Sequence, residues 1–262
     1  MTIRSLTGCM KYQLNRMMGA LAFIPIFCIA TMPTGALMAS LAENTPFTLQ
    51  GSNMTCIDVF CVAVMFVFMC CYSHDFISTA AANGASRKTA VLSQLLTVVI
   101  ISLLVTAECA VLSPLTAAIA GSEQLWGAEA YGSITILAMD GMSTAAIFIR
   151  IYIVCFMCCL TAGATGIMLT AIFYRLPVFI AAIVTCLIAF GPNLGVMAVF
   201  GIEKMKALNV WLINLAGVYA DSPKGNVAQA ALFFSILTAV EIAAAFLLLL
   251  RASVKPLPVK GE

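Results

Sequence analysis

Very few residues of this chain have side chains suited to catalysis or metal binding. Its 262 residues include a single histidine, His74, together with eleven acidic residues and eleven cysteines. The densest thiol motif is Cys-Phe-Met-Cys-Cys from Cys155 to Cys159, whose three cysteines share one face of a helix. No second pair of Cys or His completes a tetrahedral metal site with them. We therefore expect no bound metal ion and interpret the cysteines as small apolar side chains.

A second group consists of charged residues inside long apolar runs: Asp58, Glu108, Arg150 and Glu241. If these runs cross a bilayer, a central charge costs about 2.5–3.5 kcal/mol, so each side chain should face protein or water. Counting about 1.5 Å per residue puts Glu241 near the midplane and the others toward the outer side, where Arg150 can pair with an acid. Either these groups line or gate a polar path, or they form structural ion pairs or protonated buried acids.

The composition explains why such residues are rare. Hydrophobic residues make up 63% of the chain and charged residues 9%, whereas a soluble domain is about 45–50% apolar and about 25% charged. Such a chain cannot cover itself with a polar surface, so we predict an all-α integral membrane protein. A net charge of +2 provides no basic surface for nucleic acid, and 27.7 kDa leaves no room for a large soluble catalytic domain.

Apolar runs of about 20 residues or more predict six spans within one transmembrane domain over residues 1–262. The predicted spans are residues 17–42, 55–72, 89–120, 143–174, 176–200 and 227–250. An amphipathic stretch over residues 1–16 predicts an interfacial helix before them, although a merely polar leader fits its periodicity nearly as well. The first apolar run exceeds the 7–15 residues usual for a signal core, so we expect it to stay uncleaved. Residues 131–142 are interpreted as an outer interfacial or re-entrant piece.

The cationic residues predict the orientation, because Lys and Arg in short loops stay on the cytoplasmic side. With the N-terminus inside, the outer loops hold only Lys204, Lys206 and Lys224, all in the last loop. The inner segments hold nine of the thirteen cationic residues: Arg4, Lys11, Arg16, Arg87, Lys88, Arg175, Arg251, Lys255 and Lys260. Both termini are therefore predicted to be cytoplasmic.

The inner loop at residues 73–88 has the most informative polar sequence. Ser73 or Asp75 can cap a short helix, the Asn-Gly pair at 83–84 provides a left-handed stop, and Ser86 can cap the next helix. This pattern predicts a short helix under the membrane with both ends tied to spans. Such a helix can transmit a push from a soluble partner.

This loop resembles one in the type-2 family of ATP-binding-cassette transporter permeases, small bacterial subunits whose ATPase is a separate chain. Those permeases carry a phenylalanine, an asparagine-glycine pair and a Ser-Arg-Lys/Arg-Thr run after their second span. The matching residues are Phe76, Asn83, Gly84, Ser86, Arg87, Lys88 and Thr89. Two features depart from the pattern: residues 80–82 are plain alanines, and the span at 55–72 is unusually rich in Cys and Met.

The resemblance implies a coupling helix in loop 73–88 that docks onto the ATPase, with Asp75 and the motif residues from Phe76 to Lys88 at the contact. It also implies a functional unit of two permease copies, identical or related, and two ATPases. ATP and Mg would bind to those partners. This chain is then no enzyme and carries no cofactor, and it contains no Gly-x-x-x-x-Gly-Lys-Ser/Thr run for binding phosphates itself.

The same resemblance implies an exporter in the bacterial plasma membrane. Its substrates would be antimicrobial peptides, toxins or other hydrophobic or amphipathic compounds, with immunity or drug resistance as the outcome. The alternative is a non-transporting scaffold or immunity protein that binds a toxin within the bilayer. An adjacent gene for a stand-alone ATPase would favour the transporter.

Overall fold

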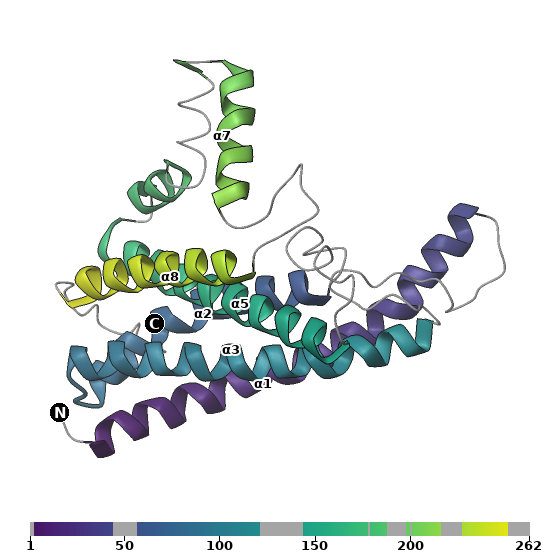
Figure 1. Cartoon of the computed structure of the whole chain (residues 1–262). Coiled ribbons are helices and arrows are strands. Elements are labelled where there is room, and N and C mark those ends of the chain that lie inside the picture. The colour runs from purple at the N-terminus through teal and green to yellow at the C-terminus, as the bar shows by residue number, and fades with distance from the viewer. Residues whose placement is uncertain are drawn as a thin grey trace.

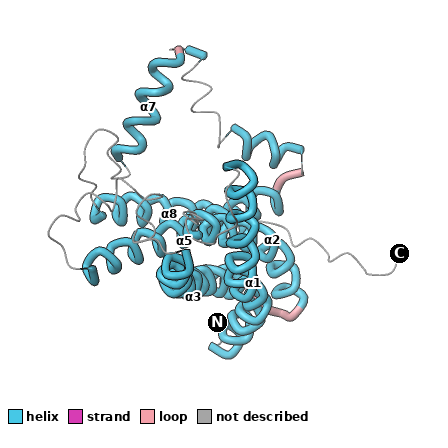
Figure 2. The backbone as a smooth tube through the Cα atoms, turned by 90° about the vertical axis from the view of Figure 1, so that its right-hand side faces the viewer, coloured by secondary structure: helices cyan, strands magenta, loops and turns pink. Residues whose placement is uncertain are grey.

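The computed structural model is almost entirely helical over the residues it describes, which contain no strand (Figures 1 and 2). It describes residues 3–43, 57–120, 144–177, 179–187, 198–199, 201–215 and 227–250. The helices are α1 (Ile3–Glu43), α2 (Ile57–Ala82), α3 (Arg87–Ala120), α5 (Thr144–Arg175), α7 (Ile202–Leu215) and α8 (Val227–Leu250). Residues 179–187 are also helical. The all-α prediction is confirmed for this part of the chain.

Four described helices are long and apolar enough to cross a membrane, as judged by length and composition. The stretches are Phe60–Ala82, Arg87–Leu112, Phe148–Arg175 and Ala228–Leu250. They overlap the predicted spans at 55–72, 89–120, 143–174 and 227–250, although the first continues ten residues past 72, and they fit a membrane protein. The spans at 17–42 and 176–200 remain predictions, because the side chains of residues 27–39 and the backbone of 188–197 lie outside the described part. The piece at 131–142 also lies outside it.

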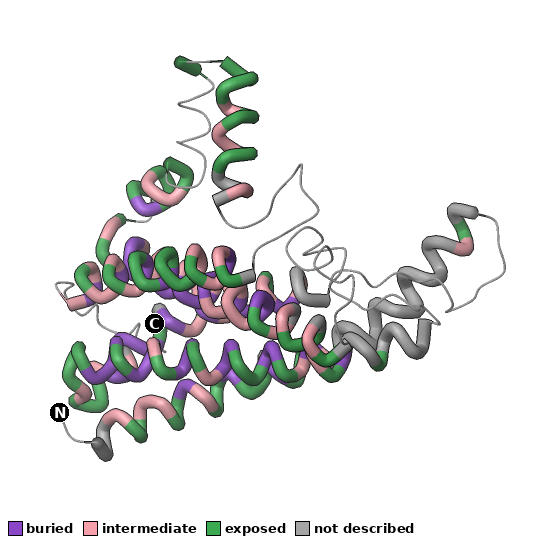
Figure 3. Tube along the Cα trace, in the orientation of Figure 1, coloured by how far each residue is buried: buried purple, intermediate pink, exposed green. Residues whose placement is uncertain are grey.

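The distribution of polar side chains also fits a bilayer. On α3 the exposed side includes Leu92, Leu96 and Val99, whereas Gln94 and Thr97 are fully buried (Figure 3). An apolar exterior around a partly polar interior is the arrangement that lipid favours, because buried hydroxyls and amides find partners on neighbouring helices. Gln94 Nε2, for example, donates to the Ser73 carbonyl of α2 at 3.2 Å.

Side-chain contacts fix the directions of the helices. α1 and α3 run the same way, since Thr97 donates to Gln13 at one end and both helices line one groove further along. α2, α5 and α8 run the opposite way. One core connects them, with Met17, Met65 and Ile101 among its fully buried members. The start of α1 and the ends of α2, α5 and α8 therefore lie at the same end of the bundle.

The positive charges follow this division. Lys11 and Arg16 of α1, Arg87 and Lys88 of α3, and Arg175 of α5 lie at the end of the bundle where α1 begins. α7, with its two lysines, stands apart from the bundle and joins the start of α8, where Gln229 Nε2 donates to the Asn214 carbonyl at 3.0 Å (Figures 1 and 2). These predicted inner cations thus lie at one end of the bundle, whereas Lys204 and Lys206 lie on α7, outside the bundle (Figure 1).

Two predicted boundaries are absent. No break separates an interfacial helix at 1–16 from a span at 17–42, because α1 is continuous over both. Likewise, the segment from Ser73 to Ala82 is the last part of α2, not a separate helix capped by Ser73 or Asp75. Neither junction contains a glycine or proline that would stop a helix, so a change in polarity alone does not end it. The lysines predicted for a loop at 204–206 lie on α7 instead.

Candidate functional site

The hairpin joining α2 to α3, residues 73–88, forms the local structures expected from its sequence. Gly84 adopts the left-handed conformation with φ of 72°, and the Asn83 amide donates to the Thr79 carbonyl at 2.8 Å. The Ser86 hydroxyl accepts from the Thr89 backbone N–H at 3.2 Å, which caps α3. The predicted left-handed stop and cap are therefore confirmed.

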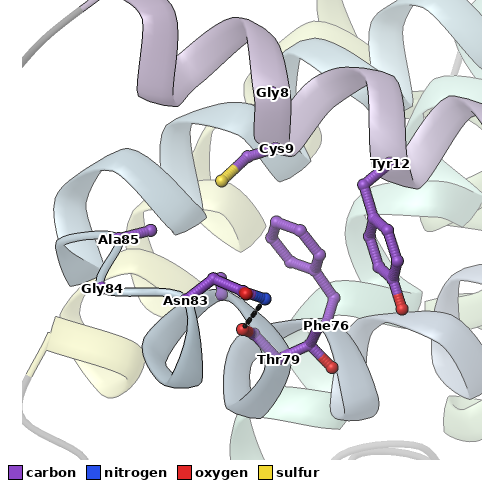
Figure 4. A pocket seen from close by; sticks show the side chains of 9 residues that line it. Gly8, Cys9, Tyr12, Phe76, Thr79, Asn83, Gly84 and Ala85 are labelled. Atoms are coloured by element: carbon purple, nitrogen blue, oxygen red, sulfur yellow. Dashed lines mark hydrogen bonds between the residues drawn. The ribbon is translucent and has the colours of Figure 1, made fainter.

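Phe76 is the buried anchor of this hairpin. Only 2% of Phe76 is exposed, and its ring stacks on Tyr12 of α1 with centroids 6.4 Å apart. Beside it, α1 and the hairpin enclose a pocket of about 280 Å³ lined by Cys9 and Asn83, among others (Figure 4). Burial raises the pKa of the Cys9 thiol. Phe76 thus holds α1 against the hairpin and is not on its outer surface.

The other predicted coupling residues, Asp75, Asn83, Gly84, Ser86, Arg87 and Lys88, are all exposed. Arg87 has a structural contact as well, because its Nη1 donates to the Leu250 carbonyl at the end of α8 at 3.1 Å. A cation at a helix C-terminus satisfies a free carbonyl and opposes the negative end of the dipole. The hairpin is consequently tied to α1 by Phe76 and to α8 by Arg87.

Glu241 is enclosed between α5 and α8. Only 7% of it is exposed, and its Oε1 lies 2.7 Å from Thr165 Oγ1. One turn away, Thr161 and Thr238 hydroxyls meet at 2.9 Å. The second carboxyl oxygen, Oε2, is buried and has no hydrogen-bond partner. The sequence indicated Glu241 as a candidate from its position along the predicted span. Thr161 and Thr165, which face it from α5, were not predicted.

Of the two acids that depth allows as partners of Arg150, Glu108 faces another helix. Glu108 lines a groove of about 610 Å³ with Met18 and Pro25 of α1, and its Oε2 is buried without a partner. The next residue, Cys109, faces α5 instead. The helix therefore turns the Glu108 side chain away from α5, where Arg150 is. The side chain of Asp58 lies outside the described residues, so a pair between it and Arg150 stays a prediction.

A cluster of thiols that the sequence pattern does not predict lies in the core. Cys61 of α2, Cys109 of α3, and Cys155 and Cys159 of α5 are all buried in the core. Cys109 interacts with Cys61 and Cys155, and Cys159 interacts with Cys155. Only the packing of three helices brings them together. Within the described part of the chain, no group of three or more His, Cys, Asp or Glu is arranged to hold a metal ion.

Comparison of the chain with family models, curated proteins and solved structures found no match.

Proposed function

We propose that this chain is the permease subunit of an ATP-binding-cassette exporter and that the hairpin at residues 73–88 receives the motion of a partner ATPase. The single observation that carries the proposal is the attachment of this hairpin to other helices. Phe76 packs it against α1 through Tyr12, and Arg87 bonds it to the last carbonyl of α8. A displacement of the exposed hairpin is therefore passed to α1, α2, α3 and α8 together.

The proposed layout has six spans, with both termini and the hairpin in the cytoplasm of a bacterium. Support comes from the positive-inside rule, because the hairpin carries Arg87 and Lys88 and the same end of the bundle carries Lys11, Arg16 and Arg175. The unit would contain two permease copies and two ATPases that bind ATP and Mg. In this layout the exposed turn between α2 and α3, two membrane-length helices, lies on the cytoplasmic side, where an ATPase can reach it.

In this mechanism, closure of the ATPases on ATP pushes the hairpin and rocks the two permease copies, which alternates access to a path between them. The exposed side chains from Asp75 to Lys88 make the contact. Phe76 and Arg87 act as positioning residues because they pass the motion to α1 and α8. The polar groups within the bundle and its apolar interior suit a hydrophobic or amphipathic substrate such as an antimicrobial peptide, a toxin or a drug-like compound.

A matched pair of charge reversals tests this function. The chain is reconstituted in vesicles with each stand-alone ATP-binding-cassette ATPase encoded in the same genome, and binding and ATP hydrolysis are measured. Lys88→Glu, on the exposed hairpin, should weaken ATPase binding by about tenfold and abolish stimulated hydrolysis, because like charges at an interface repel. Lys204→Glu, on exposed α7, should change neither. Unchanged folding is checked by the melting temperature of both variants.

Two results would overturn the proposal. One is a folded wild-type chain that binds no ATPase, which would favour the non-transporting scaffold or immunity protein. The other is an equal loss in Lys88→Glu and Lys204→Glu, because the docking surface would then not be the hairpin.

A further inference from the structure

The hydrogen atoms around Glu241 can be counted. Thr165 Oγ1 lies 2.7 Å from Glu241 Oε1 and 2.9 Å from the Thr161 carbonyl oxygen. A hydroxyl has one hydrogen to donate, and a carbonyl can only accept. Thr165 can donate to the carboxyl oxygen, or it can donate to the carbonyl of its own helix, and in the second arrangement its oxygen accepts from Glu241. The carboxyl must then carry a hydrogen on Oε1.

The neighbouring hydroxyls leave no other donor for the carboxyl. Thr161 Oγ1 lies 2.8 Å from the Met157 carbonyl and 2.9 Å from Thr238 Oγ1, so Thr238 donates to Thr161 and Thr161 donates to Met157. Each hydroxyl hydrogen is therefore used once. With Glu241 protonated, Thr165 donates to the Thr161 carbonyl and accepts from Glu241, so each short contact holds its own hydrogen. With Glu241 ionised, the single Thr165 hydrogen has to serve both contacts.

The charges around the site lead to the same conclusion. α5 presents Thr161 and Thr165 to Glu241, and its Cys158 thiol packs near Ala230, toward the start of α8. α3 meets α8 at the far end, where Arg87 binds the Leu250 carbonyl, and α7 meets it at Gln229. Among the described residues, no cation approaches Glu241. An ionised carboxylate here would be buried with one oxygen lacking any partner, which the low dielectric strongly disfavours.

We propose that Glu241 is a proton-binding site at the α5–α8 interface, occupied by a proton when the two helices are packed together. Its ligand is the proton itself, held between Oε1 and Thr165 Oγ1. Release requires Oε1 to meet water, so proton exchange is coupled to separation of α5 and α8. The site depends only on these two helices, and a negative result in the ATPase experiment would not affect it.

Infrared difference spectroscopy of the purified full-length chain in lipid tests the site. A protonated carboxylic acid has a C=O stretch separate from the bands of a carboxylate. Subtracting the Glu241→Gln spectrum from the wild-type spectrum at neutral pH should reveal this C=O band, with no loss of carboxylate bands. Loss of carboxylate bands alone would overturn the proposal. The Glu108→Gln subtraction identifies the contribution of Glu108, whose Oε2 is also buried without a hydrogen-bond partner.

Variants at Thr165 provide a second test that keeps Glu241 in place. Thr165→Val preserves shape but removes the hydroxyl, so the Glu241 C=O band should move to higher frequency as its hydrogen bond is lost. Thr165→Ser keeps the hydroxyl and should leave the band unchanged. An unmoved band in the valine variant would contradict the assigned partner and overturn the site as described. Melting temperatures establish that both variants fold.

Discussion

The two sides of α5 make different kinds of contact. Toward α2, the helix presents Gly166, and a Cβ built there would lie 2.9 Å from both the Met69 Cβ and the Phe66 carbonyl oxygen. Toward α8, it presents hydroxyls that meet Thr238 and Glu241. The contact with α2 therefore combines close backbone packing with side-chain bonds to backbone carbonyls, whereas the contact with α8 joins side chain to side chain.

This difference indicates which neighbour of α5 is the fixed one. Association of helices in lipid depends on van der Waals contact, which small residues improve by allowing backbones to approach. A shift of α2 relative to α5 would lose this close contact without forming another in its place. Hydrogen bonds between hydroxyls and a carboxyl can be replaced by water once the interface opens. We interpret α2 and α5 as a rigid pair and α8 as the helix that can separate from α5.

The largest effect is expected from Gly166→Ala. The added methyl group meets backbone and Cβ atoms of α2, which cannot turn aside, so the two helices must move apart. Overpacking of this kind costs about 1–3 kcal/mol. The free energy of unfolding, measured by SDS titration in mixed micelles, should fall by that amount.

Two other glycines serve as controls for this substitution. At Gly163 the added Cβ meets the Val98 Cγ1 at 3.0 Å and the end of the Met65 side chain at 3.2 Å, so Gly163→Ala should cost less than Gly166→Ala. At Gly19 nothing lies within 4 Å, and Gly19→Ala should be neutral or stabilise α1 by up to about 1 kcal/mol. An equal loss at all three glycines would show that close packing is not special to the α2–α5 contact.

On the α8 side, Thr165→Val should reduce the free energy of unfolding by about 1 kcal/mol, within the range measured for hydrogen bonds between membrane helices. The substitution removes the only partner of Glu241 Oε1 that the structure assigns and leaves both carboxyl oxygens unpaired. The same SDS titration measures it, with Thr165→Ser as the control that keeps the hydroxyl. A cost above that of Gly166→Ala would reverse the proposed order of the two contacts.

Local chemistry made some features predictable from the sequence. The Asn-Gly pair at 83–84 and the Ser86 cap act within one turn of the chain, so neighbouring residues suffice to specify them. The bounds of α8 and α5 also follow closely from where the apolar runs end. By contrast, a polar segment at 73–82 was mistaken for a separate helix, because a change from apolar to polar residues alters burial without interrupting backbone hydrogen bonding.

Features that depend on how the helices pack could not be predicted from the sequence. The hydrophobicity of α5 does not reveal that Thr165 faces Glu241, since they are 76 positions apart and on different helices. The same holds for the cysteines from three helices that meet in the core. The position of a residue along its helix can be predicted from the sequence, but the neighbouring helix that its side chain faces cannot. For this reason the sequence allows a pair between Glu108 and Arg150 by depth alone, whereas the structure turns the Glu108 side chain toward α1.

The smallest expected effect is the coupling between Thr161 and Thr238, whose hydroxyls meet at 2.9 Å across the α5–α8 contact. A double-mutant cycle with Thr161→Val and Thr238→Val should give a coupling free energy of about 0.6 kcal/mol, the average for such bonds in membranes. The matched cycle pairs Thr161→Val with Thr170→Val. The Thr170 hydroxyl lies on the α2 side of the same helix, 3.1 Å from the Cys70 carbonyl and 2.9 Å from the Gly166 carbonyl, and it shares no partner with Thr161, so these two changes should be additive. Equal coupling in both cycles would mean that α5 responds as one body, and the distinction between its two sides would then be lost.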